Sequence, residues 1–347
     1  MRRRWGWGAS ILMTAGVCLG AVVGLTLRAD ITGWRKVAGD RAGGAILDLG
    51  DPGQFDEAWV TCPTVVQSEG VYRLWYSSYY DSKMGPGGIG LAVSRDGCRW
   101  QRENKGRPVL GPGPEGSLDG GQVMGPEVLH DGALYRMWYT GMAREWHSSG
   151  FGYYRIFLAR SRDGVHWTRE NSGLPVFDVG PEGAFDEVQA GSPSILREQG
   201  RYRMWYAAWS PRHGHTVCLA ESEDGVRWRR ANDSQPVRGL SPQQAYGQAV
   251  CRRRGEYVML YMALEAEPGL YAASSADGVS WRMVNGGRPV LAPGSSGDFD
   301  DAVVGHPFLL DAKGRLQAWY TGYRREAGGV RGWRLRIGLA EEVRPSK

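Results

Sequence analysis

Among the segments that place an aspartate directly after an apolar residue, four occupy corresponding positions in a repeated sequence pattern, and three of these four add a second acid. They read Phe55-Asp56-Glu57, Leu118-Asp119, Phe185-Asp186-Glu187 and Phe299-Asp300-Asp301. Two carboxylates, one of them kept protonated by its surroundings, can cleave a glycosidic bond. We therefore predict that Asp56, Asp119, Asp186 and Glu187 are catalytic, and that Asp301 contacts the substrate. The same recurrence also suits a structural device, in which each aspartate caps a loop or pairs with an arginine of a neighbouring strand.

Glu127 is a further acid of a different kind. It follows Pro126 at the start of an apolar run, whereas the residues after the corresponding prolines are Thr64, Ser194 and Phe308. A carboxylate without a counterpart in a repeated frame indicates a site residue. We predict that Glu127 is catalytic.

Aromatic residues gather in segments that vary along the chain. They include Tyr80, Trp146 with His147, and Trp209. Aromatic faces stack on the C–H face of a sugar ring, so we predict that these four residues bind substrate. His213 and His215 suit either a metal pair or a solvated loop.

A sequence repeat positions these residues. One signature, Ser-x-Asp-Gly-x-x-Trp, begins at Ser94, Ser161, Ser222 and Ser275. A second is a short aromatic strand ending at Tyr76, Tyr139, Tyr206, Tyr261 and Tyr320, at intervals of roughly 60 residues. Each copy predicts four antiparallel strands with an Asp-Gly turn before the last. The fold class predicted for residues 31–347 is all-β, a five-bladed β-propeller of four-stranded antiparallel blades.

The fifth copy stops after its third strand, near Ala340, and lacks the Asp-Gly signature. The missing strand lies at the other end, where Gly33-Trp34-Arg35 opens the folded region. We predict that Trp34–Leu49 pairs with Arg334–Ala340 and closes the ring, which removes open sheet edges. The fourth copy is degenerate, with Ser241, Gln248 and Leu260 in place of Asp, Pro and Trp.

Residues 1–30 predict export. Arg2, Arg3 and Arg4 precede Trp5–Leu27, an uncharged run that as a helix of about 1.5 Å per residue would cross a hydrocarbon core about 30 Å thick. We predict a single-pass membrane anchor with the propeller outside the cytoplasm; a cleaved signal peptide and secretion is the alternative. Part of the net charge of +5 lies in this segment. The rest of the sequence has no stripe of basic residues of the kind that binds nucleic acid. Cys18 lies in the apolar run, and the other four cysteines are too far apart in the sequence to show metal-ligand spacing.

The repeat resembles the five-bladed propellers of the arabinanase, levansucrase and invertase superfamily, and most closely the glycosidases of glycoside hydrolase families 43 and 130. The matching elements are Phe185-Asp186 ahead of Pro193, Tyr202–Tyr206, Ile89–Ser94, Asp96–Trp100 and Pro108–Leu110. In family 43 the resemblance implies acids before the prolines of the first three inner strands. Here those residues are Cys62, Gly125 and Ser192, so the usual triad is absent from those positions. By analogy of blade order, the resemblance implies that Asp56 is the base, that Asp186 or Glu187 is the acid, and that Asp119 tunes the pair. Gly305-His306-Pro307 resembles the family's axial histidine, which implies that His306 holds a water or a Ca²⁺ ion on the axis, although calcium prefers oxygen ligands.

These observations favour a glycoside hydrolase-like enzyme that acts on a glycan through carboxylates in an axial pocket. The expected partner is a carbohydrate, no cofactor is required, and the membrane is contacted through the N-terminal segment only. A non-catalytic carbohydrate-binding or assembly propeller is the alternative, and an enzyme of another class on the same frame is a third reading. The sequence leaves open the sugar, the linkage, and whether the reaction retains or inverts.

Overall fold

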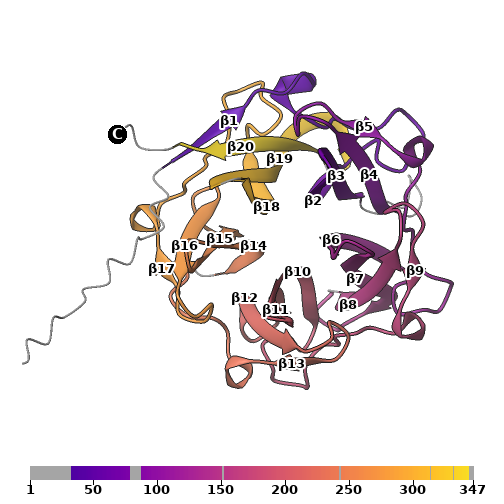
Figure 1. The fold of residues 1–347 in the computed structure, drawn as a ribbon, viewed down its shortest axis with the longest axis vertical. Coiled ribbons are helices and arrows are strands. Elements are labelled where there is room, and N and C mark those ends of the chain that lie inside the picture. The colour runs from indigo at the N-terminus through magenta and orange to yellow at the C-terminus, as the bar shows by residue number, and fades with distance from the viewer. Residues whose placement is uncertain are drawn as a thin grey trace, which may run out of the picture.

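The computed structural model describes residues 33–78, 87–150, 152–241, 244–312, 314–330 and 332–343. Within them the protein is all-β and its sheets are built from antiparallel hairpins. The strands fall into successive sets that surround a common centre (Figure 1). The fold class predicted from the repeat is confirmed to this extent.

The strands follow the repeat. The first set is β2 Thr61–Ser68, β3 Val71–Ser78, β4 Gly88–Ser94 and β5 Gln101–Arg102. The second is β6 Gln122–His130, β7 Tyr135–Trp146, β8 Gly152–Ser161 and β9 Thr168–Arg169. The third is β10 Gln189–Glu198, β11 Arg201–Ser210, β12 Gly214–Ser222 and β13 Trp228–Arg230. The fourth is β14 Ala245–Arg253, β15 Glu256–Ala263, β16 Tyr271–Ser275 and β17 Arg282–Met283, and the last is β18 Val303–Ala312, β19 Arg315–Val330 and β20 Trp333–Glu342.

Single-turn 3-10 helices punctuate the chain after the outermost strands. They span Ala42–Gly44, Asn104–Gly106, Asn171–Gly173, Asn232–Ser234 and Asn285–Gly287. In four of them an asparagine amide donates to the carbonyl of a proline four residues on, for example Asn104 to Pro108 at 2.9 Å. These turns return the chain from the rim towards the centre.

The N-terminal strand β1 (Trp34–Val37) completes the last set. It pairs antiparallel with β20, with Trp34 opposite Glu342 and Val37 opposite Leu339. The indigo strand β1 therefore lies beside the yellow strand β20 (Figure 1). The predicted pairing of the two ends is confirmed. The inner strands β2, β6, β10, β14 and β18 each contact their neighbours around the centre, β18 contacting β2, without joining into one closed sheet.

Tryptophans tie each set to the next. The buried Trp75, Trp138 and Trp205 each donate their indole N–H to the glycine carbonyl of the following set's Asp-Gly turn, at 2.8–3.0 Å. Trp319 of the last set reaches Gly97 of the first at 3.4 Å. The fourth set has Leu260 here because the set after it lacks an Asp-Gly turn, so an indole would have no such acceptor.

The predicted membrane anchor needs correction. No helix among the described residues is long and apolar enough to cross a membrane. The single-pass membrane localisation is therefore not supported. Residues 1–30, on which that prediction and the predicted signal peptide rest, lie outside the described residues.

Candidate functional site

The five inner strands break register at the same point, where they approach the axis. The break falls between Thr61 and Thr64 in β2 and recurs in β6, β10, β14 and β18. At each break one residue has a left-handed backbone, with φ between 42° and 58°: Cys62, Gly125, Ser192, Gly247 and His306. A β-bulge of this kind re-aims a side chain, here around the axis.

Hydroxyl groups of neighbouring strands hold three of these bulges. The Cys62 N–H donates to Thr321 Oγ1 at 3.1 Å, the Gly125 N–H to Ser77 Oγ at 2.8 Å, and the Ser192 N–H to Thr140 Oγ1 at 2.8 Å. A left-handed backbone costs a non-glycine residue about 1–2 kcal/mol. Such strain persists only where the surroundings enforce it and is concentrated at functional sites. Cys62, Ser192 and His306 carry it here.

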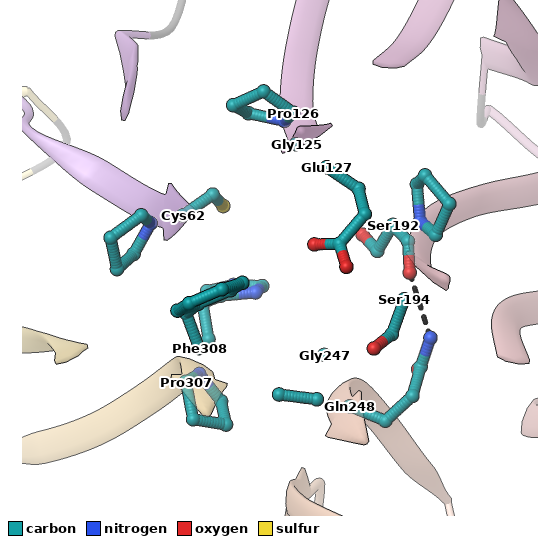
Figure 2. Close-up of a pocket in the computed structure, with 14 residues that line it drawn as sticks. Cys62, Gly125, Pro126, Glu127, Ser192, Ser194, Gly247, Gln248, Pro307 and Phe308 are labelled. Atoms are coloured by element: carbon teal, nitrogen blue, oxygen red, sulfur yellow. Dashed lines mark hydrogen bonds between the residues drawn. The ribbon is translucent and has the colours of Figure 1, made fainter. Parts of the chain in front are cut away.

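The bulges enclose a narrow cavity on the axis of the ring (Figure 2). Its volume is about 30 Å³, which is room for no more than a few water molecules. It is lined by the bulge residues together with Pro63, Pro126, Glu127, Pro193, Ser194, Gln248, Ala249, Pro307 and Phe308. The cavity is therefore too small to hold a sugar ring.

Glu127 is the only carboxylate among the described residues that line the cavity. Its side chain is almost fully buried, and its Oε1 accepts the N–H of Ile195 on the next inner strand at 3.1 Å. Thr64 and Ser194 accept the same kind of bond, from Val128 and Val250. Glu127 thus shares a frame contact with its counterparts, and it adds a carboxyl group at the cavity (Figure 2).

Burial determines the protonation of Glu127. It raises the pKa of the carboxyl from 4.5 to about 8, against hydrogen bonds from the Ile195 N–H and the Thr64 side chain that lower it. No cation offsets the burial. Glu127 is therefore largely protonated at neutral pH, as a general acid must be.

His306 lies between two neighbours on the ring. A Cβ on Gly247 would stand only 2.9 Å from His306 Nδ1, so the glycine leaves room for the imidazole. On the other side His306 forms a side-chain hydrogen bond with Cys62. Burial alone lowers the pKa of His306, but the charge and hydrogen bond of Cys62 outweigh it and hold that pKa above 6.5.

The predicted catalytic aspartates lie elsewhere. Asp56, Asp119 and Asp186 are almost fully buried, and none of them lines the axial cavity. Each accepts a tyrosine hydroxyl and an arginine: Tyr76 and Arg102 at 2.7 and 2.8 Å, Tyr139 and Arg169 at 2.9 and 2.7 Å, Tyr206 and Arg230 at 3.0 and 2.9 Å. Asp300 repeats the arrangement with Tyr320 and with Lys36 of β1. We call these groups the Tyr–Asp–cation corners.

The fourth set shows what replaces such a corner. Tyr261 donates to the backbone carbonyl of Ser241 at 2.5 Å and lies 3.2 Å from the sulfur of Met283. The aspartate and the cation are thus absent together, as expected of partners. The sequence contained this signal, because Arg102, Arg169 and Arg230 recur two residues after the Asp-Gly signature's tryptophan, where the fourth copy has Met283.

Glu187 and Asp301 close loop turns. Glu187 Oε2 accepts the N–H of Gly183, and Asp301 Oδ2 accepts the N–H of Gly297 at 3.1 Å. Neither residue lines the axial cavity. Their predicted roles in catalysis and substrate binding stay predictions.

The predicted aromatic contacts are only partly described. Tyr80 lies outside the described residues, as does the side chain of Trp146. His147 accepts or donates to Ser149 Oγ at 2.8 Å and meets the Tyr153 ring edge-on. Trp209 lies beside His215, with ring centroids 6.3 Å apart.

A row of rings continues from Trp209. The distances between successive ring centroids are 5.0 Å for His215 and Tyr246, 5.9 Å for Tyr246 and His306, 6.4 Å for His306 and Tyr323, and 6.2 Å for Tyr323 and Trp333. All six residues are half-buried. This aromatic row runs from β11 to β20 and includes one cavity residue. Sequence reasoning missed Tyr246, Tyr323 and Trp333, since no repeated pattern marks them.

The cavity does not suit calcium. Ca²⁺ takes six to eight oxygen ligands, and beside His306 lie Cys62, Gly247 and two tyrosine rings. Among the described residues no group of three or more His, Cys, Asp or Glu could hold a metal ion. We derive no step through a metal at this site.

The fold is that of the β-propeller glycoside hydrolases. One similar structure is described as a member of the GH130 family of mannoside phosphorylases, which contains glycoside hydrolases that target beta-1,2 mannosidic linkages in Candida mannan. It superposes with a TM-score of 0.63 at 17% identity, over 88% of this chain and 93% of that one. A thermostable family-43 glycoside hydrolase gives 0.59 at 18% identity, over 80% and 88%. An N-acetylgalactosamine deacetylase from F. plautii in complex with blood group B trisaccharide gives 0.63 at 18% identity, over 89% and 93%.

The sequence relatives match a smaller share of this chain than the similar structures do. A protein of Mycobacterium tuberculosis (strain CDC 1551 / Oshkosh) without a described function is 29% identical over 234 residues, 63% of this chain and 74% of that one. A 1,2-beta-oligomannan phosphorylase of Thermoanaerobacter sp. (strain X514) is 25% identical over 195 residues, 54% and 60% of the two chains. No protein-family model matches the chain. The resemblance to the propeller glycosidases is confirmed.

Proposed function

We propose that residues 31–347 form a five-bladed propeller, closed by β1, that binds a glycan over the mouth of the axial cavity and acts on a glycosidic bond there. The observation that carries the proposal is Glu127. It is a buried carboxyl at the axial cavity, without a cation, whose pKa of about 8 keeps it protonated. In this position it donates its proton to the oxygen of the departing sugar.

The aromatic row supplies the binding surface. Rings exposed beside a polar cavity stack on the C–H faces of sugars while their polar edges contact hydroxyl groups. The row reaches the cavity at His306, so a sugar that stacks on Tyr246 or Tyr323 has its reactive end close to Glu127. The names of the relatives point to beta-1,2-linked mannosides as the first glycans to test.

The cavity differs from that of a two-carboxylate hydrolase. Such an enzyme places a second acid about 5 or about 6.5–9.5 Å from the first, and Glu127 has no such partner among the described lining residues. The role of nucleophile therefore falls to a group other than a carboxylate. Inorganic phosphate is a candidate co-substrate because one relative is named as a phosphorylase.

The test measures glycan binding and turnover with the full chain. A panel of oligosaccharides that includes beta-1,2-linked mannosides is assayed with and without phosphate. We expect Glu127→Gln to bind glycan as the parent does and to lose at least 100-fold in turnover. Glu182→Gln, an exposed glutamate of a loop leading to β10, is the matched control and should keep the parent's activity.

A second candidate function is glycan binding without catalysis. It is favoured by the Tyr–Asp–cation corners, which use the repeated aspartates as parts of the frame. Binding without turnover by the parent protein would support this candidate. Unchanged turnover in Glu127→Gln would refute the role given to Glu127.

A further inference from the structure

Cys62 occupies an unusual place for a cysteine. It is the left-handed residue of the β2 bulge, directly before Pro63, and it lines the axial cavity (Figure 2). The hydroxyl of Thr321 accepts its N–H, and the same hydroxyl forms a second hydrogen bond, of 3.0 Å, with Thr61 Oγ1. The chain thus tolerates a strained, non-glycine conformation, although a glycine stands at the same position in β6 and β14.

The inner strands on either side of β2 carry a histidine and a glutamic acid that line the same cavity as Cys62. β18 contacts β2 on one side and carries His306; β6 contacts β2 on the other and carries Glu127. The imidazole of His306 is hydrogen-bonded to Cys62 and fits because Gly247 has no side chain. A thiol paired with a histidine is activated as a nucleophile, and here a protonated carboxyl lines the same cavity.

The other described cysteines lack this environment. Burial raises the pKa of Cys218 and of Cys251 to about 12, and no histidine is among the groups that shift either pKa. Cys98 lies in an Asp-Gly turn beside Asp96, and burial and that carboxylate raise its pKa. The molecule therefore contains its own controls for the reactivity of Cys62.

We propose that Cys62 is the nucleophile of the axial site, with His306 as the partner that stabilises its thiolate. This inference rests on the proposed function and fills the role for which the described lining residues offer no second carboxylate. In the family 43 enzymes that the sequence resembles, an acid stands at the position of Cys62.

The chemistry balances in two steps. In the first, Cys62 Sγ attacks the anomeric carbon, the bond from that carbon to the glycosidic oxygen breaks, and Glu127 gives its proton to the leaving oxygen. In the second, water attacks the anomeric carbon and gives a proton to the Glu127 carboxylate. The carbon–sulfur bond breaks and its electron pair returns to the thiolate beside the protonated His306. No oxidant or reductant is needed, and each step inverts the anomeric centre, so the net result is retention.

The groups that face the pair determine its pH response. They are Glu127 from β6, Tyr246 from β14 and Tyr323 from β19. Burial raises the pKa of Tyr246 to about 12 and that of Tyr323 well above 10, so both stay neutral near pH 7. Neither tyrosine therefore contributes to the pH response between pH 5.5 and 8.5.

The test combines thiol labelling with turnover. The full chain is treated with methyl methanethiosulfonate between pH 5.5 and 8.5, and modified cysteines are mapped by mass spectrometry. At pH 6.5 we expect Cys62 to react at least 10-fold faster than Cys218 and Cys251. His306→Asn should slow Cys62 at least 10-fold and move its reaction to higher pH, since asparagine tolerates a left-handed backbone. The slow reaction of Cys218 and Cys251 reports that the variant is folded.

Each outcome decides between the proposals. If Cys62 reacts no faster than Cys218, or if His306→Asn leaves its rate unchanged, the pair does not exist. If Cys62→Ser keeps the parent's turnover, Cys62 is not the nucleophile although the proposed function stands. If the parent turns over no glycan of the panel, the proposed function and the nucleophilic role both fall, and fast labelling then identifies a reactive thiol alone.

Discussion

The molecule contains two kinds of buried carboxylate, and their surroundings differ. Asp56, Asp119 and Asp186 are at most 2% exposed, and each is bound to an arginine and a tyrosine. Glu127 is 7% exposed and has no cation. Burial alone therefore does not determine whether a carboxyl group is ionised. The difference is the compensating charge, which pairs each aspartate with an arginine and is missing at Glu127, so that Glu127 is protonated.

The largest expected effect comes from breaking a Tyr–Asp–cation corner. Asp119→Asn leaves Arg169, which is only partly exposed, without its counter-charge. Removing one partner of a buried ion pair costs about 3–5 kcal/mol; because Arg169 is partly solvated, we expect about 3 kcal/mol. Urea denaturation followed by tryptophan fluorescence measures this change.

The fourth set provides the control for that measurement. Asp119→Ser combined with Arg169→Met copies the residues at Ser241 and Met283. The double variant should lose less stability than Asp119→Ser alone, because no unpaired cation remains. Strict additivity of the two single changes would show that the aspartate and the arginine do not act as a pair.

The second effect concerns Glu127 and has the opposite sign. Its native pKa of about 8 lies above the unfolded value of 4.5, so above pH 4.5 unfolding releases a proton. The stability of the parent therefore falls as the pH rises from 4.5 to 8. Glu127→Gln can still accept the Ile195 N–H, and it removes this decline.

We expect Glu127→Gln to match the parent at pH 5 and to exceed it at pH 8.5 by about 2–3 kcal/mol, less than the full shift because the native state relaxes. Melting temperatures across this pH range give the comparison. Parallel curves for the two proteins would mean that Glu127 is ionised in the native state and is not the acid of the site.

The repeat predicts the fold because its signals are local and redundant. Asp-Gly turns, aromatic strands and the missing last strand each indicate the same antiparallel sets, and β1 pairs with β20 as its sequence position requires. Even the degenerate fourth copy has a physical reason. Leu260 stands where a tryptophan would lack a turn to bind, as Trp205 binds Gly278.

The site was less accessible to sequence reasoning. Asp56 and Glu127 are both acids next to inner strands, and only the fold shows that Arg102 reaches the first and no cation the second. The sequence shows that Cys62 stands where family 43 has an acid, but its hydrogen bond with His306 joins residues that are far apart in the sequence. The local sequence around either one does not reveal that contact.

A third, smaller effect distinguishes the contribution of the tyrosine hydroxyl to stability from that of the cation within a Tyr–Asp–cation corner. Tyr139→Phe removes the hydroxyl that donates to Asp119 at 2.9 Å and leaves the Arg169 pair intact. A hydrogen bond to a charged group contributes about 1.5–3 kcal/mol, and neutral ones about 1. With Arg169 still in place we expect a loss of about 1.5 kcal/mol, which denaturant unfolding resolves. A loss as large as that of Asp119→Asn would assign the corner's stability to the hydroxyl rather than to the cation.

The smallest effect is expected at Glu187, the acid beside a frame aspartate. Its carboxylate accepts the N–H of Gly183 in an exposed loop turn, where water replaces a lost bond at little cost. Glu187→Gln keeps an acceptor and should change the free energy of unfolding by about 0.5 kcal/mol or less. It should also leave glycan turnover within twofold of the parent, since Glu187 does not line the axial cavity. Turnover reduced 100-fold at unchanged stability would instead restore Glu187 as the acid and move the site from the axis to the loops before the inner strands.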